Sequence, residues 1–248
     1  MKIKVDKNSM KLTLIFSLIH FGLALYYSYF CLGQDFIGQN NFLKILMGGI
    51  RVEESGNLFC VIMYIMPRCL FCVYVANVFM KDLKTNFIYI FIRTNKRETW
   101  LRETMIKTVK CALCYECFFT VLVFAVKIIR WNSVYFDAEE FLTMFLTEIL
   151  QMVMLVMFSN ILLLFLSETV CVFGTLIELA VPILITGITY DNNGAWQYPA
   201  KIILFNLGNY NYISECNMNL GIEVSLILVF CVVMYVIAVW RVNRYELI

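Results

Sequence analysis

Six long runs of apolar residues constrain this chain more than any other feature of its sequence. A helix needs about 20 apolar residues to cross the hydrocarbon core of a bilayer, and each run is close to that length. Because hydrocarbon cannot hydrogen-bond to a backbone, only helices and closed barrels cross it. The runs are continuously apolar rather than alternating, which predicts helices. They cover residues 12–32, 58–80, 108–129, 141–166, 170–188 and 222–240.

The composition agrees with a membrane protein. The chain is 61% hydrophobic and 15% charged, whereas soluble domains average about 25% charged residues. The first run follows several lysines but is too long for the apolar region of a signal peptide and lacks a small-residue cleavage site. We therefore read it as a retained helix. The sequence predicts an all-α polytopic protein, with residues 1–248 forming one transmembrane domain.

The distribution of basic residues predicts the orientation of the chain. Of 20 Lys and Arg residues, fourteen fall in or beside the two terminal segments and the segment 81–107, five fall on the opposite side, and Arg68 lies within a run. Cytoplasmic segments of membrane proteins carry the excess of basic residues. Both termini are therefore predicted to be cytoplasmic. The net charge of +2, with the basic residues along one membrane face, gives no indication of nucleic-acid binding.

The segment 86–107 carries the densest charge cluster, FIRTNKRETWLRE at residues 91–103. Thr94 or Asn95 can cap a helix there. From Trp100 onward, apolar residues recur at helical spacing into the third run, which predicts an amphipathic cytoplasmic helix continuous with that span. An alternative reading is a basic interfacial helix that only anchors the topology.

A second polar region separates the fifth and sixth runs. Residues 198–207 open with Pro199, a favourable first-turn residue. The segment is too short to span, so it predicts a short re-entrant or interfacial helix. An ordinary extracellular loop is the alternative.

Ionisable residues within the runs are candidate functional residues, because a charge in the bilayer centre is costly and needs a partner. They are Arg68, Glu116, Glu148 and Glu178. Since Arg68, Glu116 and Glu178 fall near the middle of their runs, we predict an Arg68–Glu116 or Arg68–Glu178 ion pair. Such a pair either stabilises the bundle or lines a transport pathway.

Pro67 and Pro182 lie inside predicted spans. A proline leaves the carbonyl four residues earlier without its helical donor, and Pro182 does this to Glu178. Both prolines are hinge candidates, although prolines are also tolerated in membrane helices for packing reasons.

The sequence lacks nucleotide-binding and zinc-protease motifs, which predicts a chain without catalytic residues, cofactor-binding residues or a metal site. His20 is its one histidine, and we expect it to be a core or interface residue. Cys111, Cys114 and Cys117 have a spacing that suits a metal, but no histidine lies near them. Packing is the expected role of these thiols.

Six spans, cytoplasmic termini and the motif IRTNKRETW before the third span resemble the type-2 ABC transporter permeases. The similarity is to the small six-span permeases of bacterial peptide, lantibiotic and bacteriocin exporters or immunity transporters. In that family the corresponding stretch is a coupling helix that docks on a separate ATP-binding subunit. The matching docking residues here are Arg93, Thr94, Lys96, Arg97, Glu98, Trp100 and Arg102.

The resemblance implies a non-catalytic permease subunit in the bacterial cell membrane. ATP and Mg would be bound by the partner ATP-binding subunit, and a second copy or a paralogous permease would complete the transmembrane unit. The substrate would be a peptide or another amphipathic molecule. Trp100 would be the apolar anchor of the docking helix. This chain differs from the family in having only about eleven residues before its first span.

Two other functions remain open on the sequence. The first is a membrane substrate-binding or immunity accessory protein that acts without ATP coupling. The second is a small secondary transporter, although such proteins usually show internal repeats and we find none. A gene for an ATP-binding subunit beside this one would favour the permease.

Overall fold

The computed structural model describes residues 7–31, 41–92, 97–131, 136–190, 208–215 and 218–244, and the regular elements within these ranges are helices. Six of them are long and apolar enough to cross a membrane. They are α1 (Lys7–Cys31), α3 (Leu58–Ile92), α4 (Arg97–Trp131), α5 (Ala138–Leu162), α6 (Glu168–Tyr190) and α9 (Leu220–Asn243). The predicted segment 198–207 lies outside the described residues.

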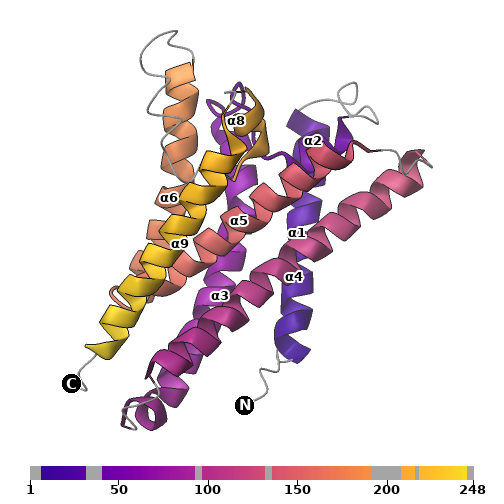
Figure 1. Ribbon diagram of the computed structural model, residues 1–248. Coiled ribbons are helices and arrows are strands. Elements are labelled where there is room, and N and C mark those ends of the chain that lie inside the picture. Colours follow the sequence, from indigo (N-terminus) through magenta and orange to yellow (C-terminus); the bar gives the residue numbers. More distant parts are fainter. Residues whose placement is uncertain are drawn as a thin grey trace.

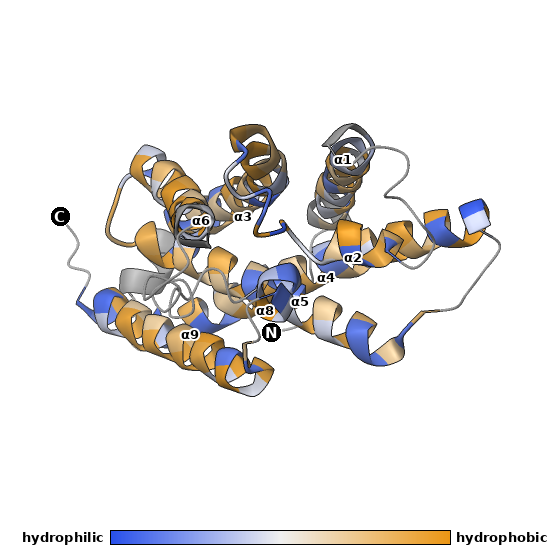
Figure 2. Ribbon diagram, turned by 90° about the horizontal axis from the view of Figure 1, so that it is seen from above, coloured by the Kyte–Doolittle hydropathy of each residue, from blue (hydrophilic) through white to orange (hydrophobic). Residues whose placement is uncertain are grey.

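The six long helices form two layers, which are clearest in the view along the bundle (Figure 2). Helices α1, α3 and α6 form one layer with α3 in the middle, and helices α4, α5 and α9 form the other with α5 in the middle. Helix α1 packs across on α4, and α3 packs across on α5. The two middle helices therefore meet at the centre of the molecule.

The surface and the core are both apolar, as expected for a bundle surrounded by lipid. Helix α9 shows this best, because Ile222, Val229, Val232 and Val236 are each 59–63% exposed and the ribbon there is mostly hydrophobic in colour (Figure 2). The largest core cluster lies between the layers and includes Phe71, Tyr115 and Leu155. Helix formation here follows from length and apolarity rather than from an amphipathic stripe.

One end of the bundle is covered by two short helices, α2 (Phe42–Met47) and α8 (Tyr210–Glu215), and we call this the cap end (Figure 1). The cap consists of α2, residues 48–57 and residues 208–215. Helix α5 starts at this end behind Asp137, whose side chain accepts hydrogen bonds from the backbone N–H groups of Glu139 and Glu140 at 3.0 and 3.2 Å. Asn219 caps α9 in the same way, which is the usual role of these residue types.

The opposite end is the stalk end, where the last turns of α3 and the first turns of α4 extend beyond the neighbouring helices (Figure 1). Each of these two helices has 35 residues, or about 50 Å at 1.5 Å per residue. Helix α3 therefore continues through residues 81–92, beyond residue 80, where the predicted second span ends. The start of α1 and the end of α9 also lie at the stalk end (Figure 1).

Candidate functional site

The centre of the bundle holds an ion pair between its two middle helices. Arg68 of α3 donates from Nη2 to both carboxylate oxygens of Glu148 of α5, at 2.7 and 2.8 Å. Both side chains are almost fully buried, at 3% and 1% exposed. The sequence predicted that Arg68 pairs with Glu116 or Glu178. This prediction is wrong, because Glu148 is the acid that pairs with Arg68.

The depth of each residue explains this pairing. Helices α3 and α5 both start at the cap end, and Arg68 and Glu148 each lie ten residues after the start at Leu58 and Ala138. Ten residues correspond to about 15 Å of helix. The two side chains therefore reach the same depth, whereas the predicted pairs depended only on the position of each residue within its own apolar run.

The remaining contacts of the Arg68 guanidinium come from α3 and α1. Its Nη1 donates to the backbone carbonyl of Tyr64 at 2.9 Å and lies 3.5 Å from Nε2 of His20. The Tyr64 ring stacks against the guanidinium, with 3.8 Å between the ring centroid and Cζ. The attraction between a cation and an aromatic face is stronger when the cation is desolvated. Helices α1, α3 and α5 therefore all contribute contacts to this buried charge.

Aromatic stacking and a second polar contact surround the pair. The His20 ring is stacked on Phe119 at 4.0 Å and on Tyr115 at 5.6 Å between centroids. The Tyr64 hydroxyl donates to Oε1 of Gln151 at 3.0 Å. The sequence reasoning did not assign Tyr64 or Gln151 to a site, although a glutamine within an apolar span is itself a signal.

Glu116 of α4 is the second carboxyl of this region. It is 1% exposed, and its Oε1 has no hydrogen-bond partner among the residues that the structure describes. The hydroxyls of Tyr115 and Thr120 on the same helix also have none within those residues. We call Arg68, Glu148, His20 and Glu116 the central cluster, in which one arginine and one carboxylate pair while the second carboxyl stands apart.

A small cavity connects the central cluster with the cap. Its volume is about 30 Å³, and His20, Tyr64 and Arg68 line its inner end, while Leu46 and Gly49 line its cap end. The apolar side chains of Ala24, Ile45 and Met63 line the cavity as well. A buried water needs about 10–15 Å³ together with polar partners, so this cavity is large enough and polar enough to hold water beside Arg68.

Glu178 of α6 lies outside the central cluster. It is 8% exposed, and neither carboxylate oxygen has a hydrogen-bond partner in the described part of the chain. Both α3 and α6 continue through their prolines, Pro67 and Pro182. Pro67 directly precedes Arg68, so the helix next to the buried ion pair lacks one backbone hydrogen bond.

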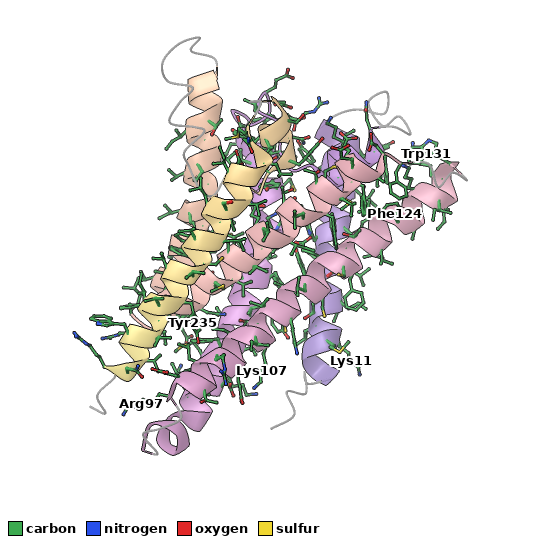
Figure 3. The ribbon with its side chains drawn as sticks, in the orientation of Figure 1. Lys11, Arg97, Lys107, Phe124, Trp131 and Tyr235 are labelled. Atoms are coloured by element: carbon green, nitrogen blue, oxygen red, sulfur yellow. The ribbon has the colours of Figure 1, made fainter. Side chains whose placement is uncertain are left out.

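The stalk carries the residues predicted to dock on a partner. Arg93, Thr94 and Lys96 lie outside the described residues. Arg97, at the stalk end of α4 (Figure 3), donates to the carbonyl of Asn243 at 3.2 Å, and the Asn243 amide donates to Glu98 at 2.7 Å. The start of α4 is thus clasped to the end of α9.

Trp100 does not face outward as a docking anchor would. Its side chain is 7% exposed and packs against Phe79 of α3, with 5.8 Å between ring centroids. The predicted role of Trp100 as an apolar docking anchor is therefore corrected. The indole is buried against α3 within the chain, where its apolar area is removed from water. Glu98 and Arg102 are the exposed predicted docking residues on α4.

The cap is held together by short polar contacts. Asn209 and Asn211 donate from their amides to the carbonyls of Ile50 and Gly49, at 2.8 and 2.9 Å. Gly49 adopts φ +82°, a left-handed conformation that glycine tolerates at little cost. The cap is also joined to α1, because the Tyr27 hydroxyl donates to Glu54.

Glu54 has an unusual environment for a carboxyl outside the membrane spans. Burial raises its pKa to about 7, opposed by the hydrogen bond from the Arg51 backbone and reinforced by the nearby Glu215 carboxylate. Glu215 in turn accepts from the backbone N–H of Val52 at 3.0 Å. Two acids, one from the turn before α3 and one from the end of α8, therefore lie near each other in the cap.

The side chains that could bind a metal ion are not grouped into a site in the described part of the chain. Across the described ranges, no group of three or more His, Cys, Asp and Glu side chains is placed to hold a metal ion. Cys111 is buried while Cys117 is exposed, so the thiols of this cysteine series point to different sides of α4.

The fold and the buried polar centre define a class: a six-helix, multi-pass membrane protein with an ion pair between its middle helices. The chain belongs to the family described as "Protein of unknown function (DUF2705)", whose model matches residues 13–248. Neither a curated protein nor a solved structure gives a significant match.

Proposed function

We propose that this chain is the membrane-spanning permease subunit of an ATP-driven ABC transporter. The observation that carries the proposal is the path of α3 and α4, which cross the bundle without interruption and continue to the stalk end, where α3 ends at Ile92 and α4 begins at Arg97. At this end the last turns of α3 and the first turns of α4 extend beyond the neighbouring helices (Figure 1), and the sequence that resembles a coupling helix includes the start of α4.

The two stalk helices form a lever that ends at the central cluster. Arg68 belongs to α3 and Glu116 to α4. A displacement of the stalk by a closing pair of ATP-binding subunits moves both helices, and with them both residues. ATP must favour one conformation of its subunits over the other for such coupling to work. ATP and Mg are bound by that partner, and this chain contributes no catalytic group.

The proposed docking surface consists of exposed charged residues rather than of Trp100. Glu98 and Arg102 are exposed on the described part of the stalk. Arg93, Thr94 and Lys96 directly precede α4 in the sequence. Arg97 ties the start of α4 to α9, and Trp100 packs it against α3. Charged groups then select the partner, while the buried indole keeps the stalk rigid.

Charge asymmetry supports the orientation that this function needs. Lys11, Arg97 and Lys107 lie toward the stalk end, whereas Trp131 lies at the cap end of α4 (Figure 3). Basic residues gather on the cytoplasmic side of membrane proteins. We place the stalk and both termini in the cytoplasm and the cap outside, in a bacterial cell membrane.

The remaining parts of the proposal follow from the resemblance. A second copy of the chain, or a paralogous permease, forms the transmembrane unit with it. The substrate is a peptide or a similar amphipathic molecule, which is exported or expelled from the membrane.

Co-expression and co-purification with a candidate ABC ATP-binding subunit from the same genome tests the proposal. Arg102→Glu reverses an exposed stalk charge and should lower the recovery of that subunit by tenfold or more. Arg130→Glu is the matched control, because Arg130 is an exposed arginine near the other end of the same helix. If expression of the chain protects cells from a peptide equally well when they lack every such subunit, the chain acts instead as an accessory binding protein without ATP coupling.

A further inference from the structure

The central cluster holds one more acid than base. Arg68 and Glu148 neutralise each other through two short hydrogen bonds. Glu116 is equally buried, but Arg68 makes its hydrogen bonds to Glu148 and to the carbonyl of Tyr64 rather than to Glu116. Oε1 of Glu116 has no hydrogen-bond partner in the described part of the molecule. A second negative charge here would be uncompensated.

Within the described ranges, Arg68 is the permanent positive charge that acts on Glu116. Helix α9 meets the stalk end of α4 through Asn243 and Glu98, and Lys44 of α2 is paired with Glu140 at the cap end. Each packed element brings its own titratable groups toward this region: His20 from α1, Tyr64, Arg68 and Cys72 from α3, Tyr115 from α4 itself, and Glu148 from α5.

An isolated carboxylate in an apolar interior is costly, and such a group usually takes up a proton instead of remaining charged. For a proton to be a functional ligand, it must also have a route to water. The cavity beside His20 and Arg68 reaches from the cluster to Gly49 in the cap and is large enough to hold the water that would receive the proton, and Glu116 itself is not among the residues that line it. His20 lines this cavity and stacks on Tyr115, the neighbour of Glu116 in the chain.

We propose that the central cluster is a proton-binding site. Glu116 holds the proton while Arg68 is paired with Glu148. When the O–H bond of Glu116 breaks, the proton passes by way of the His20 side of the cluster to water in the cavity, because Glu116 itself does not line the cavity. The charge of the cluster then falls by one. The new carboxylate then competes with Glu148 for the arginine, so Arg68 moves from α5 toward α4.

This exchange changes which helices are tied together at the centre. With the proton bound, the ion pair joins α3 to α5. After release, it joins α3 to α4, the two helices that share the stalk. The proton site would therefore connect the state of the stalk to the acidity on the cap side. The inference goes beyond the proposed transport function, and it is tested on the chain alone.

The proton is observed directly by infrared spectroscopy of the full chain in lipid vesicles at neutral pH. A protonated carboxyl has a C=O stretching band that a carboxylate lacks. Glu116→Gln should remove one such band from the spectrum. Glu139→Gln replaces an exposed carboxyl at the start of α5 and should leave these bands unchanged. Glu116→Asp, which keeps a carboxyl, should move the band without removing it.

Glu148→Gln tests the exchange of partners. Glu148 is ionised in the pair and contributes no protonated band, yet its replacement should abolish the Glu116 band because Arg68 then pairs with Glu116. A purely structural role of Glu148 would not change this band. Ala24→Leu narrows the cavity and should slow the hydrogen–deuterium exchange of the band at least severalfold.

Three results would overturn the proposal. An unchanged set of protonated bands in both Glu116→Gln and Glu116→Asp shows that Glu116 is ionised. A persisting Glu116 band in Glu148→Gln excludes the exchange of Arg68 between the two acids. An unchanged exchange rate in Ala24→Leu excludes the cavity as the proton route. Because no partner subunit is present, these results do not depend on whether the chain is a permease.

Discussion

Arg68 is the residue at which four of the six long helices are connected. It bonds to Glu148 on α5, approaches His20 on α1, and belongs to α3, while Glu116 on α4 completes the cluster. A buried ion pair gains little stability overall, because desolvating both charges offsets their attraction. Its value lies in specificity, since a misaligned α5 would leave two buried charges without partners.

Arg68→Leu should destabilise the protein strongly, because it leaves the Glu148 carboxylate buried without its cation. Loss of one partner of a buried pair costs about 3–5 kcal/mol. The double variant Arg68→Leu/Glu148→Leu should recover a large part of this loss. Unfolding in detergent micelles measures both changes. A double variant that is as unstable as the two single losses added together would contradict the pairing.

Glu54 makes the stability of the cap depend on pH. Its pKa in the folded protein, about 7, lies above the value of about 4.3 for a free glutamate. The folded state therefore binds the proton more tightly than the unfolded state, and this contribution is present at acidic pH. It falls as the pH rises from about 4 and is lost above 7.

Glu54→Gln should accordingly flatten the fall of the melting temperature between pH 5 and pH 8. Glu53→Gln is the matched control, because Glu53 is the exposed neighbour of Glu54 and its replacement should leave the slope as in the parent protein. Equal slopes in the parent protein and in Glu54→Gln would show that Glu54 does not titrate in this range.

At the scale of elements, the apolar runs predicted where helices exist but not where they end. The second run stops at Lys81 in the sequence, yet α3 continues to Ile92. Charged residues at the membrane surface end the apolar run but do not end the helix. Residues 68–96 contain no glycine or proline, the residues that most often end a helix. The length of a helix beyond the bilayer was therefore underestimated.

The partner of Arg68 was predictable in principle. Counting residues from the cap end places Glu148 at the depth of Arg68, given the alternation of spans. What the sequence could not supply is the packing of the layers, which decides that α5 and not α4 or α6 faces α3 at this depth. The prediction that Trp100 is a docking anchor was wrong for a similar reason. Helical spacing identifies an apolar face of a helix but not the element that packs against it.

Gly49 is the position where the cap depends on a single backbone conformation. A Cβ at this residue would lie 2.6 Å from Oδ1 of Asn209, and the left-handed conformation costs a non-glycine residue roughly 1–2 kcal/mol by itself. Gly49→Ala should lower the melting temperature by several degrees. Gly56→Ala is the control, because a Cβ there meets nothing within 4 Å. Similar melting temperatures for both variants would contradict this account of the cap.

At the scale of the molecule, two layers of three helices meet through one buried ion pair, with a polar cap at one end and a two-helix stalk at the other. The fold class followed from composition and run length, because a bilayer accepts few alternatives. The proposed function depends on the stalk, where α3 and α4 carry any displacement toward Arg68 and Glu116.

Site-specific photo-cross-linking from residue 102 tests that central claim most directly. A photoreactive amino acid at position 102, on the exposed face of the stalk, should cross-link to the candidate ATP-binding subunit when both are expressed together. The same group at position 130, at the cap end of α4, should yield no such product. Cross-links from position 130 alone, or from neither position when both proteins are present in the membrane, would contradict the proposal that the stalk docks on an ATP-binding subunit.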